Sequence, residues 1–176
     1  MTAMTVLGAF VTALQRVQVD RIHHPQLGVQ ERVLCYELYH QLRLLEESGE
    51  FHCHPASLQG ELSKRAQHLF PDKQAIPDFL VHEPGTDENN LAVVEVKRAR
   101  ADWNKIACDV SKLARFAHEL GYEERILLLF NSEGEELDTI HSRIVESYAR
   151  GDTTIDVLFY DVRNGSVEHR QITYAA

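Results

Sequence analysis

Apolar residues recur along the chain at two spacings, one typical of helices and the other of strands. Spacings of three and four residues predict four helices, at residues 5–19, 29–47, 102–120 and 135–150. Alternating or unbroken apolar runs predict strands at 79–82, 91–97, 125–131, 154–160 and 167–174, with a short strand within 51–62. Helices that alternate with strands favour a mixed β-sheet with helices packed on it. The pattern therefore predicts one α/β domain over residues 1–176.

The strand at 91–97 is the most informative of these runs. Its side chains alternate between two faces, and both faces are apolar as far as Glu95. A strand that is apolar on both faces is typical of the centre of a covered sheet. Glu95 and Lys97 share one face at its end, where a carboxylate and an amine cost free energy unless they serve a function. They are the first candidates for a functional site.

Asp78 is the third candidate. Pro77-Asp78 opens the strand at 79–82, and the polar residues 84–90 that follow this strand are typical of a turn. A hairpin of the two strands places Asp78 close to Val96, at the end of the sheet that carries Glu95. Whether Asp78 points to the face of Glu95 depends on a register choice of one residue or on a bulge.

These residue types suit a metal-dependent phosphodiesterase. Asp78 and Glu95 supply oxygen ligands of the kind that Mg²⁺ prefers, and the backbone carbonyl of Val96 would add another. A bound divalent cation neutralises charge on a phosphate and lowers the pKa of an attacking water. Lys97 would orient that water or stabilise the pentacovalent phosphorus. The predicted cofactor is Mg²⁺ or Mn²⁺.

The residues Pro77-Asp78 and Glu95-Val96-Lys97, within a helix, strand, hairpin, helix and strand at 29–131, resemble the PD-(D/E)XK nuclease superfamily. The resemblance implies a restriction-endonuclease-like fold: a mixed central β-sheet flanked by helices, with an α-β-β-β-α-β core. Residues 1–28 would add an N-terminal helix and loop, and residues 132–176 a C-terminal helix and hairpin. It also implies that Asp78 and Glu95 bind the metal ion and that Lys97 assists the water.

Many members of this superfamily place a glutamate near the start of the helix that precedes the sheet. Glu31 looks like that residue and would join the catalytic and metal-binding set, with Glu37 as the competing candidate. The alternative for Glu31 is an acid favoured by the helix dipole. On the following helix, the segment Asp109-Val-Ser-Lys112-Leu is similar to a pattern of small bacterial members, in which basic residues face the substrate.

The net charge of −9 argues against a protein that coats nucleic acid nonspecifically. The charge is uneven, however. The segment from Lys97 to Arg115 holds six basic and two acidic residues, which gives +4 there and −13 in the rest of the chain. One interpretation is a solvated helix face. The other is a phosphate-binding surface beside the site, made by four of the basic residues: Arg98, Arg100, Lys105 and Lys112.

Other polar residues give weaker signals. His52, Cys53, His54 and His68 suggest zinc, but zinc ligands are usually two spaced pairs, and no such frame occurs here. Glu61 could project from the short strand towards the site, although a solvated charge is favoured. The three cysteines of the chain are unclustered, which suits a reducing cytoplasm. No apolar run reaches the ~20 residues of a membrane span, and the N-terminus does not have the form of a signal peptide.

The chain is therefore expected to be a stand-alone, magnesium-dependent nuclease that acts on DNA. The first alternative is a catalytically inactive module of the same fold that binds a protein or nucleic acid partner. The second is a structural zinc protein. A homodimer would suit a nuclease that cuts both strands of DNA, but nothing in the sequence requires one.

Overall fold

The computed structural model describes residues 4–60, 76–86, 88–100, 102–131 and 137–174. Within them the chain forms short and long helices that alternate with strands. In chain order the elements are α1 (Val6–Arg16), α2 (Val19–Ile22), β1 (His23–His24), β2 (Gly28–Val29), α3 (Glu31–Glu47), β3 (Ser57–Gly60), β4 (Phe79–His82), β5 (Ala92–Arg98), α4 (Trp103–Leu120), β6 (Glu124–Asn131), α5 (Leu137–Tyr148), β7 (Ala149–Asp161) and β8 (Ser166–Tyr174).

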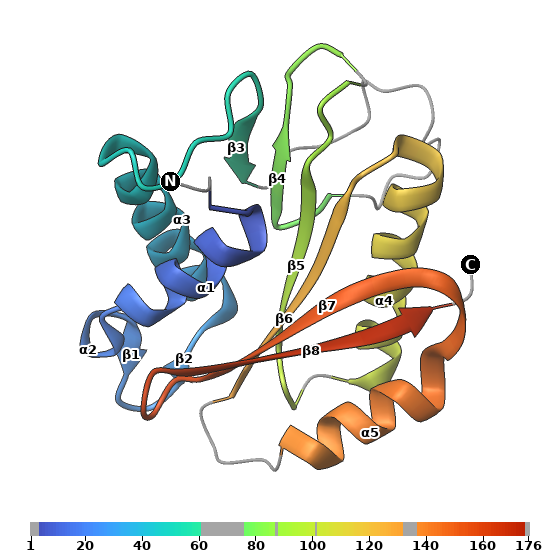
Figure 1. Cartoon of the computed structure of the whole chain (residues 1–176). Helices are drawn as coiled ribbons and strands as arrows, with labels where there is room; N and C mark the ends of the chain where they lie inside the picture. The colour runs from blue at the N-terminus through green and yellow to red at the C-terminus, as the bar shows by residue number, and fades with distance from the viewer. Residues whose placement is uncertain (1–3, 61–75, 87, 101, 132–136, 175–176) are drawn as a thin grey trace.

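The main sheet has the order β3-β4-β5-β6-β7-β8 among these elements. Strands β5, β6 and β7 are parallel, and the other neighbours are antiparallel. Helices α1 and α3 cover one face and α4 and α5 cover the other (Figure 1). The prediction of a mixed α/β sheet flanked by helices is confirmed, and so is the central position of β5.

The two faces of the sheet bury two separate hydrophobic clusters, because alternate residues of each strand point to opposite sides. Val94 and Leu128 pack with Phe10 and Leu38 on the side of α1 and α3. Their neighbours along the strands pack on the side of α4 and α5, as Val93, Leu127, Val110 and Ile144 show. Glu95 points to this second side, since it follows Val94 on β5.

The N-terminal segment differs from the prediction of one helix at 5–19. The helix ends at Arg16, and α2 begins separately at Val19. Gly28, with φ 63°, and Val29 pair with His24 and His23, so β1 and β2 form a small hairpin that was not predicted. Because Val29 belongs to this hairpin, α3 begins at Glu31 rather than at residue 29.

The remaining bounds differ from the predictions by a few residues. The predicted short strand is β3, and β4 has the predicted bounds. Strand β5 runs one residue further, to Arg98, and Asp102 caps α4 instead of belonging to it. The largest difference is β7, which begins at Ala149 where the helix was expected to continue to 150. Glu61 and His68 lie outside the described residues.

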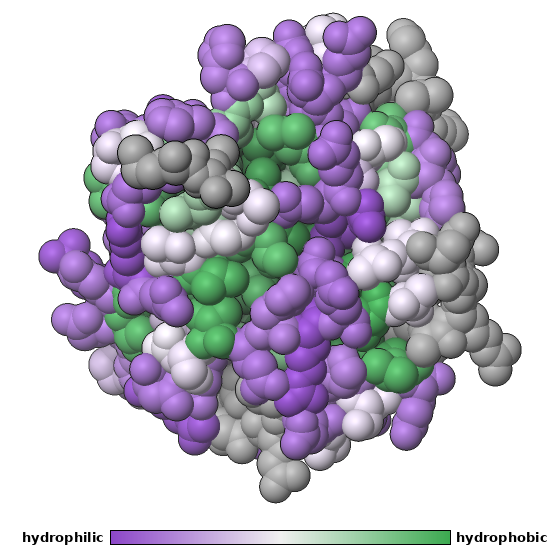
Figure 2. All heavy atoms as spheres, in the orientation of Figure 1, coloured by the Kyte–Doolittle hydropathy of each residue, from purple (hydrophilic) through white to green (hydrophobic). Residues whose placement is uncertain are grey.

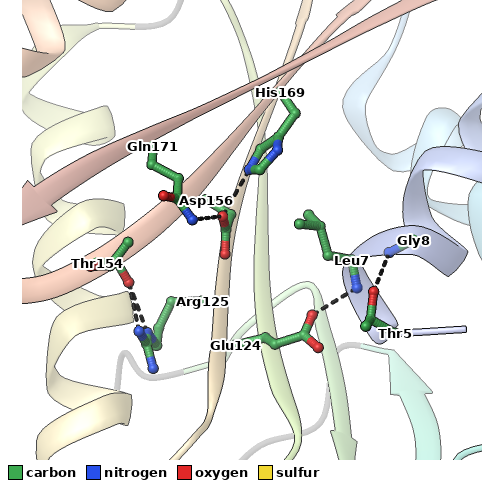
Figure 3. Close-up of polar contacts among 9 residues, drawn as sticks. All are labelled: Thr5, Leu7, Gly8, Glu124, Arg125, Thr154, Asp156, His169 and Gln171. Atoms are coloured by element: carbon green, nitrogen blue, oxygen red, sulfur yellow. Dashed lines mark hydrogen bonds and ion pairs between the residues drawn. The ribbon is translucent and has the colours of Figure 1, made fainter.

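Helix α1 is tied to the sheet at its N-terminus. Thr5 Oγ1 accepts a hydrogen bond from the Gly8 N–H at 3.1 Å, and Glu124 Oε2, from β6, accepts one from the Leu7 N–H at 2.7 Å (Figure 3). Both satisfy amide groups that have no partner within the helix. Burial raises the pKa of Glu124, although these amide hydrogen bonds oppose that rise.

Hydrophobic residues reach the surface around α1, with hydrophilic residues over the β7–β8 pair (Figure 2). Within the described residues, no helix combines the length and apolarity that a membrane span requires.

Candidate functional site

The register of the hairpin places Asp78 beside Glu95. Phe79 pairs with Val94, so the preceding residue, Asp78, lies opposite Glu95 and shares its face. Asp78 Oδ2 accepts a hydrogen bond of 2.6 Å from the Val96 N–H. The sequence left the orientation of the Asp78 side chain open, and in the structure it lies on the face of Glu95. Because the N–H and C=O of one residue in a strand point to the same side of that strand, the Val96 carbonyl also points to the side of β5 on which Asp78 lies.

Glu95 is a buried carboxylate. It is 2% exposed, and burial raises its pKa to about 8. Lys112 Nζ lies 2.8 Å from Oε1 and opposes this rise, but desolvation outweighs the attraction. Within the described residues Oε1 makes this ion pair without an aligned hydrogen bond. Burial also raises the pKa of Asp78, against the stabilising effect of the Val96 N–H.

Lys97, near the end of β5, forms ion pairs with carboxylates from two helices. Its Nζ lies 3.3 Å from Glu31 Oε1 and 3.5 Å from Asp109 Oδ2. Burial alone would lower the pKa of Lys97, but these two carboxylates outweigh burial and raise it. Lys97 is therefore an ammonium group at neutral pH. Glu31, the first residue of α3, is the glutamate brought to the site, whereas Glu37 accepts a hydrogen bond from Gln41 on its own helix.

Asp109 and Lys112 bring α4 into the site. Lys112 was predicted as a surface contact for substrate, but its Nζ lies between Glu95 and Asp109 Oδ1, at 2.8 and 3.3 Å. Asp109 was not predicted as a site residue. A signal was present, because Asp109 is an acid in the apolar stripe of α4, three residues after Ile106 and next to Val110.

The other predicted substrate contacts are Arg98, Arg100 and Lys105. Arg98 Nη2 donates to the Val29 carbonyl at 3.0 Å and thus braces the segment before α3. Arg100 is exposed two residues after the end of β5, and Lys105 is exposed on α4. Glu61 is outside the described residues.

Six side chains therefore form what we call the ionic cluster: Glu31, Asp78, Glu95, Lys97, Asp109 and Lys112. With every acid ionised, four carboxylates and two ammonium groups give a formal charge of −2, and with Glu95 protonated, as burial favours at neutral pH, the charge is −1. One Asp109 oxygen and one Glu95 oxygen are buried without an aligned hydrogen bond among the described residues. This donor set of oxygen atoms and its charge deficit fit a hard divalent cation.

The carboxylates are nevertheless not gathered as a finished metal cage. In the part of the chain that the structure describes, no three His, Cys, Asp or Glu side chains are placed to hold a metal ion together. The lysines lie between the acids instead. The predicted ligands Asp78, Glu95 and Glu31 thus share one end of the sheet with their counterions.

The histidines and cysteine considered for zinc are also not grouped in the described residues. His52 and His54 are exposed, while Cys53 is buried with its Sγ 3.7 Å from Glu46 Oε1. Burial raises the pKa of the Cys53 thiol to about 11, which disfavours the thiolate that binds zinc. His68 lies outside the described residues.

Comparisons of the chain with protein-family models, with curated proteins and with solved structures found no match.

Proposed function

We propose that the chain is a divalent-metal-dependent nuclease that hydrolyses phosphodiester bonds in DNA. The observation that carries this proposal is the placement of Asp78, Glu95 and Lys97 side by side at one end of two central strands. Burial of the Glu95 carboxylate there costs free energy. Packing alone gives no reason for an acid at this position. Acids beside an ammonium group are the parts that metal-assisted hydrolysis uses.

The order of helices and strands also supports the proposal of a nuclease. Helix α3 is followed by the antiparallel strands β3, β4 and β5, then by α4, and then by β6 parallel to β5. This order agrees with the α-β-β-β-α-β core that the resemblance to the restriction-endonuclease-like fold implies. Glu95 and Lys97 lie on its third strand, and Asp78 directly precedes its second strand.

The metal ion of such a site would be Mg²⁺ or Mn²⁺, held by Asp78 and Glu95 with the Val96 carbonyl and Glu31. When bound, this ion supplies charge neutralisation at the phosphate and a lower pKa for the attacking water. Two features of the ionic cluster suit such an ion: its oxygen donors and its negative charge.

The chain's own residues then position and stabilise the reaction. A water oxygen forms a bond to phosphorus, and the bond from phosphorus to one ester oxygen breaks. The water gives up a proton to solvent, and the leaving oxygen takes one from solvent. Lys97 remains protonated, so it acts by donating hydrogen bonds to the water or to a phosphoryl oxygen, and not as a base. Glu31 and Asp109 hold its ammonium group in place.

The charge distribution supports a polyanionic substrate at this end of the sheet. Arg100 and Lys105 are exposed next to the ionic cluster in sequence, within the segment of net charge +4. They would bind phosphates on either side of the scissile bond. The acidic remainder of the chain would repel DNA elsewhere and restrict binding to this surface.

A plasmid-cleavage assay tests the proposal. The full chain is incubated with supercoiled plasmid DNA and Mn²⁺ or Mg²⁺, and with EDTA as the metal-free control. We expect nicked and linear products with metal only, and their loss in Lys97→Ala and Asp78→Asn. The matched control is Glu119→Gln, which removes a charge from an exposed ion pair of α4 and should cut normally. Activity unchanged in Lys97→Ala or Asp78→Asn would refute the site.

A catalytically inactive module that binds a protein or nucleic acid partner is the second candidate. It is favoured by one observation: in the described residues the acids are paired with lysines and form no metal cage. Calorimetric titration with Mn²⁺ separates the candidates. Binding that disappears in Asp78→Asn supports the nuclease, whereas absence of binding by the wild type supports the inactive module.

A further inference from the structure

Asp109 connects the two lysines of the ionic cluster. Its Oδ1 lies 3.3 Å from Lys112 Nζ and its Oδ2 lies 3.5 Å from Lys97 Nζ. One buried carboxylate, on a residue 7% exposed, thus contacts an ammonium group from its own helix and another from β5. This bridge is separate from the hydrogen bond between Asp78 and Val96 on the strands.

The position of the bridge is fixed by packing. Asp109 is in the stripe of α4 that faces the sheet, where Ile106 and Val110 are fully buried. Its side chain is short, so its carboxylate stays where the helix puts it. The lysine side chains are long and flexible, and each could place its ammonium group at many points. A fixed anion between the two lysines restricts both.

We propose that Asp109 is a positioning residue for phosphodiester hydrolysis, holding the ammonium groups of Lys97 and Lys112 where both contact the scissile phosphate. This inference rests on the proposed nuclease function. It gives Lys112 a role inside the site, in contact with the reacting group, instead of on the outer surface of the helix.

The chemistry explains why two fixed ammonium groups would be useful. When the water oxygen bonds to phosphorus and its proton leaves, the phosphoryl group passes from one negative charge to two. An ammonium group that is already in place interacts more strongly with this state than with the bound diester. Loss of Asp109 should therefore reduce kcat much more than it raises KM for DNA.

Labelling of lysines tests the positioning without using activity. The wild type, Asp109→Asn and Glu119→Gln are treated with a bulky, water-soluble amine-reactive ester, and labelling is followed by peptide mass spectrometry. Lys97 and Lys112 should react more slowly than Lys105, which is exposed on α4. In Asp109→Asn both should react faster than in the wild type, although Glu31 and Glu95 remain as their partners, and in Glu119→Gln their rates should not change. Labelling rates of Lys97 and Lys112 in Asp109→Asn that equal those of the wild type would overturn the inference.

Cleavage kinetics of the same proteins test whether the positions of Lys97 and Lys112 contribute to catalysis. In Asp109→Asn we expect kcat to fall about 10- to 100-fold, the range seen when a group that orients a metal ligand is removed, with KM nearly constant. Asp109→Glu, which keeps the charge, should recover part of kcat and part of the protection. An unchanged kcat in Asp109→Asn would overturn the catalytic role of the bridge. A wild type that cuts no DNA would instead overturn the proposed function, while the labelling result would still decide whether Asp109 places the lysines.

Discussion

Replacing Glu95 by glutamine should stabilise the metal-free protein at alkaline pH. Glutamine has nearly the shape of glutamate, but it has no proton to lose. In the wild type, burial keeps the Glu95 proton bound up to a pKa of about 8, compared with the ordinary 4.5. The unfolded chain releases this proton near pH 4.5. Between these values the folded state binds more protons than the unfolded state, so the contribution of Glu95 lowers stability as pH rises.

The size of the effect follows from the pKa. A pKa difference of one corresponds to 1.36 kcal/mol, so the rise at Glu95 corresponds to about 5 kcal/mol of lost stability above pH 8. This is an upper bound, because relaxation around a buried charge and entry of water reduce such costs. We expect Glu95→Gln to gain roughly 2 kcal/mol relative to the wild type between pH 5 and pH 8.5. Lys112 keeps Asp109 as its partner in this variant.

Urea denaturation in EDTA at a series of pH values from 5 to 9 measures the difference directly. Titrating groups outside the ionic cluster cancel, because they are common to the two proteins and do not interact with Glu95. Glu119→Gln is the control and should differ from the wild type by a constant amount. Adding Mn²⁺ at pH 8.5 should raise the stability of the wild type and have less effect on Glu95→Gln, because ligand binding stabilises the folded state. A difference between wild type and Glu95→Gln that does not change with pH would refute the reasoning.

Three further substitutions test the fold around the site. Glu124→Ala removes the acceptor of the Leu7 N–H and should cost about 1–2 kcal/mol by urea denaturation; unchanged hydrogen exchange at Leu7 would contradict this. Arg98→Ala removes the bond to the Val29 carbonyl, and cleavage by added protease should become faster at residues 24–29; an unchanged cleavage rate there would count against the bracing role. Gly121→Ala places a side chain at a residue with φ 68° at the end of α4, so it should lower the free energy of unfolding by about 1 kcal/mol in the same denaturation assay. An unchanged free energy of unfolding would contradict this.

Sequence reasoning succeeded where local pattern decides the structure. The apolar run before Glu95 predicted a central strand, because only a strand covered on both faces is apolar on both. The stripe of α4 predicted a helix with one buried face, and its end at Gly121 was also correct. These signals come from neighbours in the chain, so no distant contact was needed to interpret them.

The missed features depend on distant contacts. The break between α1 and α2 and the pairing of Gly28 with His24 cannot be seen in a helical spacing that continues through Val17. The Asp78 orientation needed the register, since a shift of one residue turns a side chain to the other face. It was settled by the position of Val94 opposite Phe79.

Asp109 shows why the site is larger than its sequence motif. The sequence motif includes only residues on or beside two neighbouring strands. The free energy of a buried acid depends on all the charges around it. At Glu95, desolvation exceeds the attraction of Lys112, and Asp78 and Asp109 add repulsion. A divalent cation at this site would reverse the balance, because four carboxylates would then face three cationic groups. With all four acids ionised, the two lysines supply half of the positive charge that the acids need, and the remaining deficit is the physical reason to expect metal binding here.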